Sequence, residues 1–378
     1  MSRIKVLIID NNILVRRAVT SVLNKHKDIE ILWLTDDSAD MEKVVRHQKP
    51  DVVLLSIDDM HSNGLTILSN FRSRFPSLPI VIMSPRSTEG AEAVITGLRM
   101  GAIDFVTKPR HTNLILFAER HLEKRLEPII RIASKIKVRK KLDEEILQSL
   151  IQPQKMFKDL TEQPSIRLSV DLVVIGGCTG GTKSLFTILS NLPENLAAPI
   201  VIVQHLPQTY AKILAEKLNA NTRLMVREAS NGIALQEGDV WIAPGGYHCE
   251  IGKTSYQPVL NTHRGLRENN MRPSIDILFR SAAEVYKKNT LGVILSGCGK
   301  DGLAGARAIK RAGGQIIVQD PQTAIAPELP LSIIQKGLTK EYFSPEELAD
   351  EITNRVREGA SKSKAHSQDT MVGNVLNF

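Results

Sequence analysis

The stretch that decides the fold reads LVVIGGCTGGTKSL and runs from Leu172 to Leu185. Apolar residues of strand type come first, a glycine-rich turn around Cys178 follows, and a helix-like pattern begins at Thr182. Glycine allows backbone conformations that other residues disfavour, and a strand–turn–helix junction of this kind presents a nucleophile above a sheet. Cys178 is therefore the first candidate for a catalytic residue.

The C-terminal half repeats this alternation of strand and helix. Strands are expected at 171–175, 199–204, 291–295 and 315–318, and helices from 182, at 208–218 and at 303–312. Alternation with short connections predicts an α/β unit with a parallel sheet, whose working groups lie at the carboxyl ends of the strands. The segments 240–248 and 256–260 are interpreted as β-hairpin material added at the sheet edge.

The N-terminal half shows the same pattern with five strand-length apolar runs. They lie at 4–9, 31–34, 52–55, 80–83 and 105–106. This predicts a five-stranded, parallel, doubly wound sheet. The polar residues at the predicted strand ends are Asp10, Asn11, Ser56, Ser84 and Lys108.

Composition suggests where one unit ends and the next begins. We expect a first domain at 1–125, a helical hinge and linker at 126–168, a second domain at 169–357 and a flexible tail at 358–378. Pro128 is expected to kink or end any helix that continues from the first domain. The tail is rich in serine and lysine, which is typical of disorder.

Charge and cysteine content exclude several classes of protein. Many bases behind the net charge of +8 crowd between Lys124 and Lys141, where a solvated helix explains them, and no nucleic-acid reading motif accompanies them. Three cysteines in 378 residues do not suggest a disulfide framework. No apolar run approaches the roughly 20 residues of a membrane span. A cytoplasmic protein without nucleic-acid binding or membrane insertion is expected.

Three polar residues follow three different predicted strands of the second half. Cys178, His205 and Asp301 are a thiol, an imidazole and a carboxylate. Because parallel strands end along one edge, the three are expected to meet as nucleophile, base and orienting acid. Backbone N–H groups after Cys178, with residues 297–299 opposite, are expected to hold an oxyanion.

The first half resembles a response-regulator receiver domain, most specifically in GAIDFVTKP at 101–109. In that family an acidic pair after the first strand and an aspartate ending the third hold Mg²⁺, and the third-strand aspartate accepts a phosphoryl group. Here the pair is Asp10-Asn11 and the acceptor position is Ser56. A serine hydroxyl attracts Mg²⁺ weakly and cannot form an acyl phosphate. Lys108 and Ser84 are interpreted as structural hydrogen-bonding groups, and Asp58 is displaced by two residues from the acceptor point.

The second half resembles the catalytic domain of the chemotaxis receptor methylesterase family, CheB. The matching segments are 175–182, 204–207, 242–245 with His248, 272–276 and 292–302. That family hydrolyses glutamyl methyl esters and deamidates glutamines on chemoreceptors through a serine, a histidine and an aspartate, which match Cys178, His205 and Asp301. The resemblance implies an oxyanion or substrate cleft formed by Thr179, Gly180, Cys298, His248, Arg272 and Ser274.

The chain departs from the family at the nucleophile, where cysteine replaces serine. One outcome is a cysteine hydrolase that passes through a thioester, with slow ester turnover because thiolate leaves more readily than methoxide. The alternative is an inert relative that binds receptors without turnover. The implied partners are methyl-accepting chemotaxis receptors and, for the receiver, a chemotaxis histidine kinase. No cofactor and no metal are expected.

Three rival interpretations of the glycine-rich loop remain open. The segment 177–184 differs by one residue from a phosphate-binding loop, because Thr182 stands at the second glycine position. Cys178, Cys298, His205 and Asp301 contain the side-chain types that bind Zn²⁺, although without a compact ligand spacing. Cys178 and Cys298 are also candidates for a redox pair.

Overall fold

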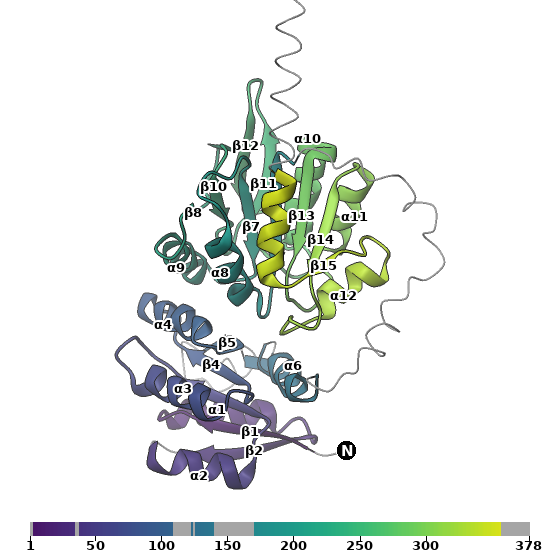
Figure 1. The fold of residues 1–378 in the computed structure, drawn as a ribbon. Coiled ribbons are helices and arrows are strands. Elements are labelled where there is room, and N and C mark those ends of the chain that lie inside the picture. Colours follow the sequence, from purple (N-terminus) through teal and green to yellow (C-terminus); the bar gives the residue numbers. More distant parts are fainter. Residues whose placement is uncertain (1–2, 35–37, 109–121, 124, 140–169, 357–378) are drawn as a thin grey trace, which may run out of the picture. The chain divides into compact units, whose positions relative to one another are not determined.

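The computed structural model describes residues 3–34, 38–108, 122–123, 125–139 and 170–356 (Figure 1). The chain divides into two compact units, Met1–Glu144 and Glu145–Phe378. The expected tail at 358–378 and most of the expected linker lie outside the described residues.

The first unit is built on a five-stranded sheet. Its strands are β1 (Ile4–Ile9), β2 (Ile29–Leu34), β3 (Val52–Ser56), β4 (Ile80–Ser84) and β5 (Asp104–Thr107), flanked by α1 (Ile13–Leu23), α2 (Ser38–Gln48), α3 (Asn63–Arg74) and α4 (Thr88–Arg99). The strand order is β2-β1-β3-β4-β5, and every neighbouring pair is parallel. The predicted doubly wound sheet is confirmed. Its strand order reverses between β1 and β3, which is where such sheets place their working groups.

Helix α6 (Leu126–Arg139) packs against β3 and β4 of the first unit. Leu126 and Ile130 are fully buried. Pro128 lies in the first turn, where its missing N–H would have no partner within the helix. The expected kink or end of a helix that continues from the first domain stays a prediction, because residues 109–121 and 124 lie outside those described.

The second unit is built on a seven-stranded sheet. Its strands are β6 (Leu172–Gly177), β7 (Ile200–Gln204), β8 (Met225–Glu228), β10 (Asp239–Ile242), β13 (Thr290–Ile294), β14 (Gln315–Gln319) and β15 (Tyr342–Phe343). The order is β15-β14-β13-β6-β7-β10-β8, with all neighbours parallel. The central strand β6 lies between β7 and β13, and the carboxyl ends of these three strands carry the candidate site.

Helices connect and cover these strands (Figure 1). They are α8 (Gly181–Asn191), α9 (Gln208–Asn219), α10 (Ile275–Tyr286), α11 (Leu303–Arg311) and α12 (Glu328–Gln335), with a 3₁₀ turn at Lys287–Asn289. Helix α10 packs on β6, β11 and α11. Its residues Ile275, Leu278 and Phe279 are fully buried in the core of the unit.

The predicted hairpin is present as β11 (His248–Lys253) and β12 (Pro258–His263), which pair antiparallel and, with β9 (Ile233–Ala234), form a separate three-stranded sheet. The assignment of 240–242 to hairpin material is wrong. These residues belong to β10, between β7 and β8 in the main sheet. The physical reason is burial, since Val240, Trp241 and Ile242 are all buried, as parallel strands covered on both faces require.

Within the part of the chain that the structure describes, no helix combines the length and apolar character needed to cross a bilayer.

Candidate active site

Cys178 directly follows β6, the central strand of the second sheet. Its N–H donates to the carbonyl of Ser296 at 3.0 Å, and its carbonyl accepts from the Gln204 side chain at 2.6 Å and from the N–H of Gly181 at 3.0 Å. Gly180 then caps α8 with a φ of 81°, in the left-handed region that favours glycine. The thiol-bearing residue is thus held on a fixed turn and is 8% exposed.

Burial distinguishes Cys178 from Cys249. Cys249 is completely buried, and burial raises the pKa of its thiol, so this residue is a core side chain and a poor source of thiolate. Cys298 is of intermediate exposure, and none of the three cysteines is joined in a disulfide. Cys178 is the cysteine that lies at the strand ends together with other polar groups.

His205 follows the neighbouring strand β7 and lies between Cys178 and Asp301. Its Nε2 is 2.8 Å from Asp301 Oδ2, and its buried Nδ1 has no hydrogen-bond partner, while the Cys178 side chain lies near enough to act electrostatically on the ring. Burial lowers the pKa of His205, but the charge of Cys178 and the hydrogen bond with Asp301 outweigh it and raise the pKa to about 9. The surroundings of His205 therefore favour the imidazolium.

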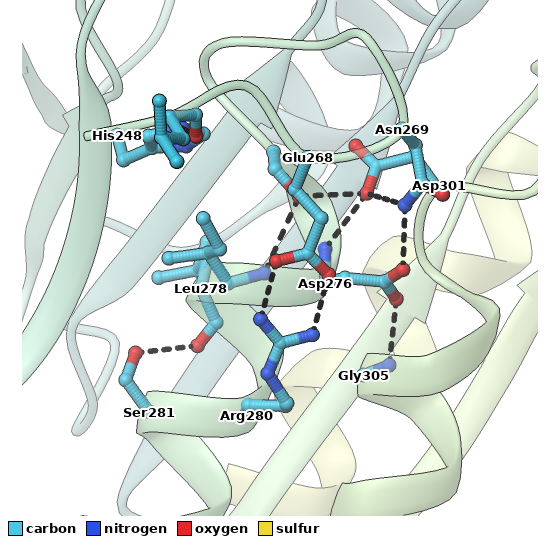
Figure 2. Close-up of polar contacts among 12 residues, drawn as sticks. His248, Glu268, Asn269, Asp276, Leu278, Arg280, Ser281, Asp301 and Gly305 are labelled. Carbon is cyan, nitrogen blue, oxygen red and sulfur yellow. Dashed lines mark hydrogen bonds and ion pairs between the residues drawn. The ribbon is translucent and has the colours of Figure 1, made fainter. Parts of the chain in front are cut away.

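The Asp301 carboxylate lies at the N-terminus of α10 (Figure 2). Besides His205 it accepts hydrogen bonds from Ser274 Oγ at 2.7 Å, the Ile275 N–H at 2.8 Å, the Asp276 N–H at 3.1 Å and Asn269 Nδ2 at 3.2 Å. Burial raises the pKa of Asp301, but these donors and His205 hold it below its usual range. The carboxylate is thus fixed in position and kept ionised.

A second carboxylate, Asp276, fixes the loop that carries Asp301. Its Oδ1 accepts from the N–H groups of Gly302 and Gly305 at the start of α11, at 2.9 and 2.6 Å, and its Oδ2 accepts from Asn269 Nδ2 at 2.9 Å (Figure 2). Burial raises the pKa of Asp276, and the N–H of Gly305 opposes that rise. Helices α10 and α11 therefore cap one another, each through a carboxylate supplied by the other's N-terminal region, and Asn269 bridges the two.

Of the residues expected in the cleft, some contact Asp301 or the turn at Cys178, and others hold a neighbouring loop instead. Ser274 contacts the carboxylate of Asp301, and the carbonyl of Thr179 accepts from Ser296 Oγ at 2.7 Å beside the Cys178 turn. His248 and Arg272 instead hold a neighbouring loop, through the carbonyls of Leu266 and Gly265, each at 2.8 Å.

Two N–H groups expected to face an oxyanion are used within the protein. The N–H of Gly181 donates to Cys178, and that of Gly297 donates to the carbonyl of Ala326 at 2.8 Å. A β-carbon at Gly297 would lie 3.0 Å from the Cys178 β-carbon, so the 297–299 loop does pack against the thiol-bearing residue. The N–H groups of Gly181 and Gly297 are therefore not available to the predicted oxyanion.

Residue-level reading of the sequence gave no role to Asn269, Asp276, Ser296 or Gln204. Asp276 carried a usable signal, because a Ser274 N-cap followed by an acid in the first turn indicates a helix start. That signal does not reveal which second helix the carboxylate would reach. The Asn269 bridge depends on loop and helix packing that the sequence pattern does not contain.

The polar residues of the first sheet gather around Lys108. Its Nζ is 2.5 Å from Ser56 Oγ, 2.6 Å from Asp58 Oδ1 and 3.0 Å from Asp10 Oδ2. The carbonyl of Ser84 accepts from the Lys108 N–H at 2.7 Å, but its hydroxyl donates elsewhere, to the carbonyl of Gly90 at 3.1 Å. A Mg²⁺ ion would have to share the Asp10 and Asp58 carboxylates with the lysine ammonium, so these residues do not fit the cation well.

Asn11, the last residue predicted for that pocket, is exposed. Across the described residues, no cluster of three or more histidine, cysteine, aspartate or glutamate side chains is arranged to hold a metal ion. Lys183 of the rival phosphate-loop interpretation is exposed, and the neighbouring Thr182 is buried at the second glycine position.

The fold and the site define a class of protein, an α/β hydrolase-type unit that follows a receiver-type unit. Residues 6–118 match the family described as response regulator receiver domain, and residues 173–352 match that described as CheB methylesterase. The chain belongs to the CheB family of receiver-linked methylesterases.

Individual relatives cover nearly the whole chain. A protein-glutamate methylesterase/protein-glutamine glutaminase of Trichodesmium erythraeum is 31% identical over 94% of this chain and 100% of its own length. A protein of the same name from Thermotoga maritima is 32% identical over 92% of this chain and 98% of its own. The crystal structure of the Thermotoga maritima CheB methylesterase catalytic domain is 37% identical, covers 50% of this chain and 99% of that domain, and has a TM-score of 0.48.

Proposed function

We propose that the chain removes methyl groups from glutamyl methyl esters of chemoreceptors, and deamidates receptor glutamines, through Cys178, His205 and Asp301. The observation that carries the proposal is the His205 ring, whose Nε2 is held by the Asp301 carboxylate at 2.8 Å and whose Nδ1 has no hydrogen-bond partner, with the Cys178 side chain near enough to act electrostatically on it. Membership of the methylesterase family supports glutamyl groups as the substrate class.

In the first half of the reaction the Cys178 thiolate attacks the ester carbonyl carbon. The new S–C bond turns the carbonyl oxygen into an oxyanion, and the N–H groups of Thr179 and Gly180, directly after Cys178, are the proposed donors to it. His205 then gives a proton to the departing methoxide, the C–O bond breaks, and methanol leaves behind a thioester. Since Nε2 faces Asp301, Nδ1 is the ring nitrogen left to serve the thiol and the leaving group.

In the second half a water molecule replaces the leaving group. His205, now neutral, takes a proton from the water as its oxygen attacks the thioester carbon. The tetrahedral intermediate expels the Cys178 thiolate and leaves a glutamate carboxylate. Deamidation follows the same route with ammonia as the leaving group. Asp301 stabilises the imidazolium formed in each half and fixes the ring orientation.

Proton delivery matters more for cysteine than for serine. A thiolate leaves more readily than methoxide, so an intermediate with an unprotonated leaving group collapses back to the ester. Asp301, whose hydrogen bond and charge help to raise the pKa of His205, still faces the ring after Cys178 has reacted and favours delivery of the ring proton to the leaving group. This supports turnover with sulfur at position 178 over an inert relative.

The proposed partners are methyl-accepting chemotaxis receptors as substrates and a chemotaxis histidine kinase for the receiver. Phosphorylation at the third-strand position is not part of the proposal, because Ser56 cannot form an acyl phosphate and donor groups of Lys108 already engage Ser56, Asp10 and Asp58.

The test measures methanol release from a methylated receptor fragment and from a small glutamyl methyl ester, using the full chain. We expect turnover by the wild type, retention of measurable turnover by Cys178→Ser, and a loss of at least about 10³-fold in Cys178→Ala. A thioester adduct at Cys178, detected by mass spectrometry after rapid quenching, would support the covalent route. Unchanged turnover in Cys178→Ala would refute the nucleophile, and receptor binding without turnover by any form would favour the inert alternative.

A further inference from the structure

The loop at residues 264–271, which joins β12 to the start of α10, is a defined structure. Its tip is a two-residue turn, in which Asn269 and Asn270 have φ values of 52° and 62°. Glu268 and Met271 exchange backbone hydrogen bonds across the turn, at 3.2 and 2.8 Å. Positive φ at both central residues is the requirement of a tight hairpin turn, and asparagine tolerates it.

Side chains from three elements hold this 264–271 loop in place. Buried His248 donates from Nε2 to the Leu266 carbonyl at 2.8 Å, and burial lowers the pKa of this histidine, which favours the neutral ring. Arg272 donates to the Gly265 carbonyl at 2.8 Å. The carboxylate of Glu268 accepts two hydrogen bonds from Arg280, at 2.7 and 2.6 Å (Figure 2). The backbone of the loop is therefore fixed at both ends and at its centre.

This fixed loop presents a leucine to solvent beside the candidate site. Leu266 is 94% exposed, although its own carbonyl is bound by a completely buried histidine. Three residues further along, Asn269 contacts Asp301 at 3.2 Å. Leu266 is thus three residues from the side chain that contacts Asp301, and the hydrogen bond to its carbonyl fixes the backbone that carries it.

The charges of the loop favour an acidic partner. Arg264 and Arg267 are exposed on either side of Leu266. Arg264 stacks over the Tyr247 ring at 4.7 Å, which fixes its direction. The acidic residue of the loop, Glu268, is already paired with Arg280. An apolar contact residue between two positive charges complements an apolar side chain between carboxylates, and glutamyl segments of the proposed substrate offer such carboxylates.

We propose that the 264–271 loop is a docking contact for the protein substrate. Leu266 packs on an apolar side chain of the receptor segment, and Arg264 and Arg267 pair with glutamates beside it. This proposal rests on the methylesterase function proposed above and adds how a receptor segment is distinguished from a small glutamyl ester.

The test compares two substrates for one variant. In Leu266→Ala, kcat/KM for the methylated receptor fragment is expected to fall about 10-fold, mainly through KM, since truncating an interface anchor costs about 1–2 kcal/mol. For a small glutamyl methyl ester, which cannot reach the loop, kcat/KM of this variant is expected to stay within about twofold of the wild-type value. Tyr256→Ala is the matched control, because Tyr256 is 95% exposed at the tip of the β11–β12 hairpin, and it should leave both substrates unaffected.

The arginines provide a second readout. Arg264→Gln with Arg267→Gln is expected to flatten the salt dependence of receptor turnover without changing turnover of the small ester. Equal losses on both substrates in Leu266→Ala would show a structural role and overturn the proposal, as would no loss on the receptor fragment.

An affinity measurement tests the docking proposal independently of the proposed hydrolase function. The receptor fragment is expected to bind the Cys178→Ala chain about 10-fold more tightly than the Cys178→Ala, Leu266→Asp chain. This difference is measured without turnover, so it holds or fails even if the wild type hydrolyses neither substrate. Equal affinities of the two chains would overturn the docking role.

Discussion

Each of the two sheets of this protein gathers polar side chains at the carboxyl ends of its strands, but the two clusters differ in the chemistry that they allow. In the receiver unit, Lys108 lies 3.0 Å from Asp10 and 2.6 Å from Asp58, and the neighbouring hydroxyl of Ser56 completes the cluster. In the second unit, His205 lies 2.8 Å from Asp301, and the Cys178 side chain acts electrostatically on its ring.

The two clusters differ in their basic residue, which is Lys108 in the first and His205 in the second, and in the groups that this residue faces. The receiver cluster balances a lysine with two carboxylates and holds no nucleophile stronger than a hydroxyl. The second cluster places a ring that can give and take a proton between a thiol and a carboxylate. Parallel-sheet geometry therefore brings polar groups together in both units, and the residue types alone decide which cluster does chemistry.

The strongest test of this difference between the clusters removes one carboxylate charge from each of them. Asp301→Asn is expected to lower kcat for the small glutamyl ester by about 10³ to 10⁴-fold, because an amide neither stabilises the imidazolium nor fixes its orientation. Asp10→Asn in the receiver cluster should leave that rate within about twofold. A matching loss in Asp10→Asn would show that the receiver cluster controls the hydrolase site.

A second test concerns stability in the receiver unit. Lys108→Met leaves the carboxylate of Asp10, which is 2% exposed, without its cation, and is expected to destabilise this unit by about 3 kcal/mol. Urea unfolding measures the change. Lys25→Met is the control, because Lys25 pairs with Glu123 at an exposed site and should cost about 1 kcal/mol or less. Similar losses in both variants would show that the Lys108 cluster is no more than a surface ion pair.

The pH dependence of stability tests the second cluster. The pKa of His205 is about 9 in the folded protein and near 6.5 when unfolded, so its stabilising effect is complete below pH 6.5 and is lost as pH rises toward 9. The second unit should lose on the order of 2 kcal/mol over this window, measured by denaturant unfolding. His205→Gln should remove the dependence, and Cys178→Ala should weaken it. A wild-type stability that stays flat from pH 6.5 to 9 would contradict the raised pKa.

The smallest expected effect comes from the amide that bridges Asp301 and Asp276. Asn269→Gly keeps the positive φ of the turn but removes the bridge, and should lower kcat about fivefold, as expected for one hydrogen bond of about 1 kcal/mol. Because the lost donor favoured ionised Asp301, the acid limb of the pH–rate profile should move to higher pH. Asn270→Gly is the matched control at the adjacent turn position and should change neither quantity.

Much of the fold was predictable, because strand and helix patterns are local. The five-stranded sheet, the parallel second sheet and the β11–β12 hairpin were all expected from short apolar runs and the residues between them. The assignment of 240–242 failed because a short buried strand has no alternation that would distinguish it from an edge hairpin. The start of α6 at Leu126 was not predicted, because the pattern around it carries no mark of a helix start.

The placement of site residues was predictable only where a strand end fixed it. Cys178 and His205 directly follow adjacent strands, and their proximity follows from the pairing of β6 with β7. Thr179 and Ser274 were expected near the site, but the action of Ser274 on Asp301 was not. His248 and Arg272 were expected in the cleft, yet their side chains hold the 264–271 loop.

The sequence by itself determined the two α/β units, the strand ends that carry the thiol, imidazole and carboxylate, and the serine, Ser56, at the end of the third strand. These properties depend on residue type and local periodicity. The tertiary structure decided what surrounds each group: the crossed capping of α10 and α11 by Asp301 and Asp276, the Asn269 bridge and the exposure of Leu266. Such features arise when helices and loops distant in the chain pack together, because hydrogen bonding and burial act between neighbours in space.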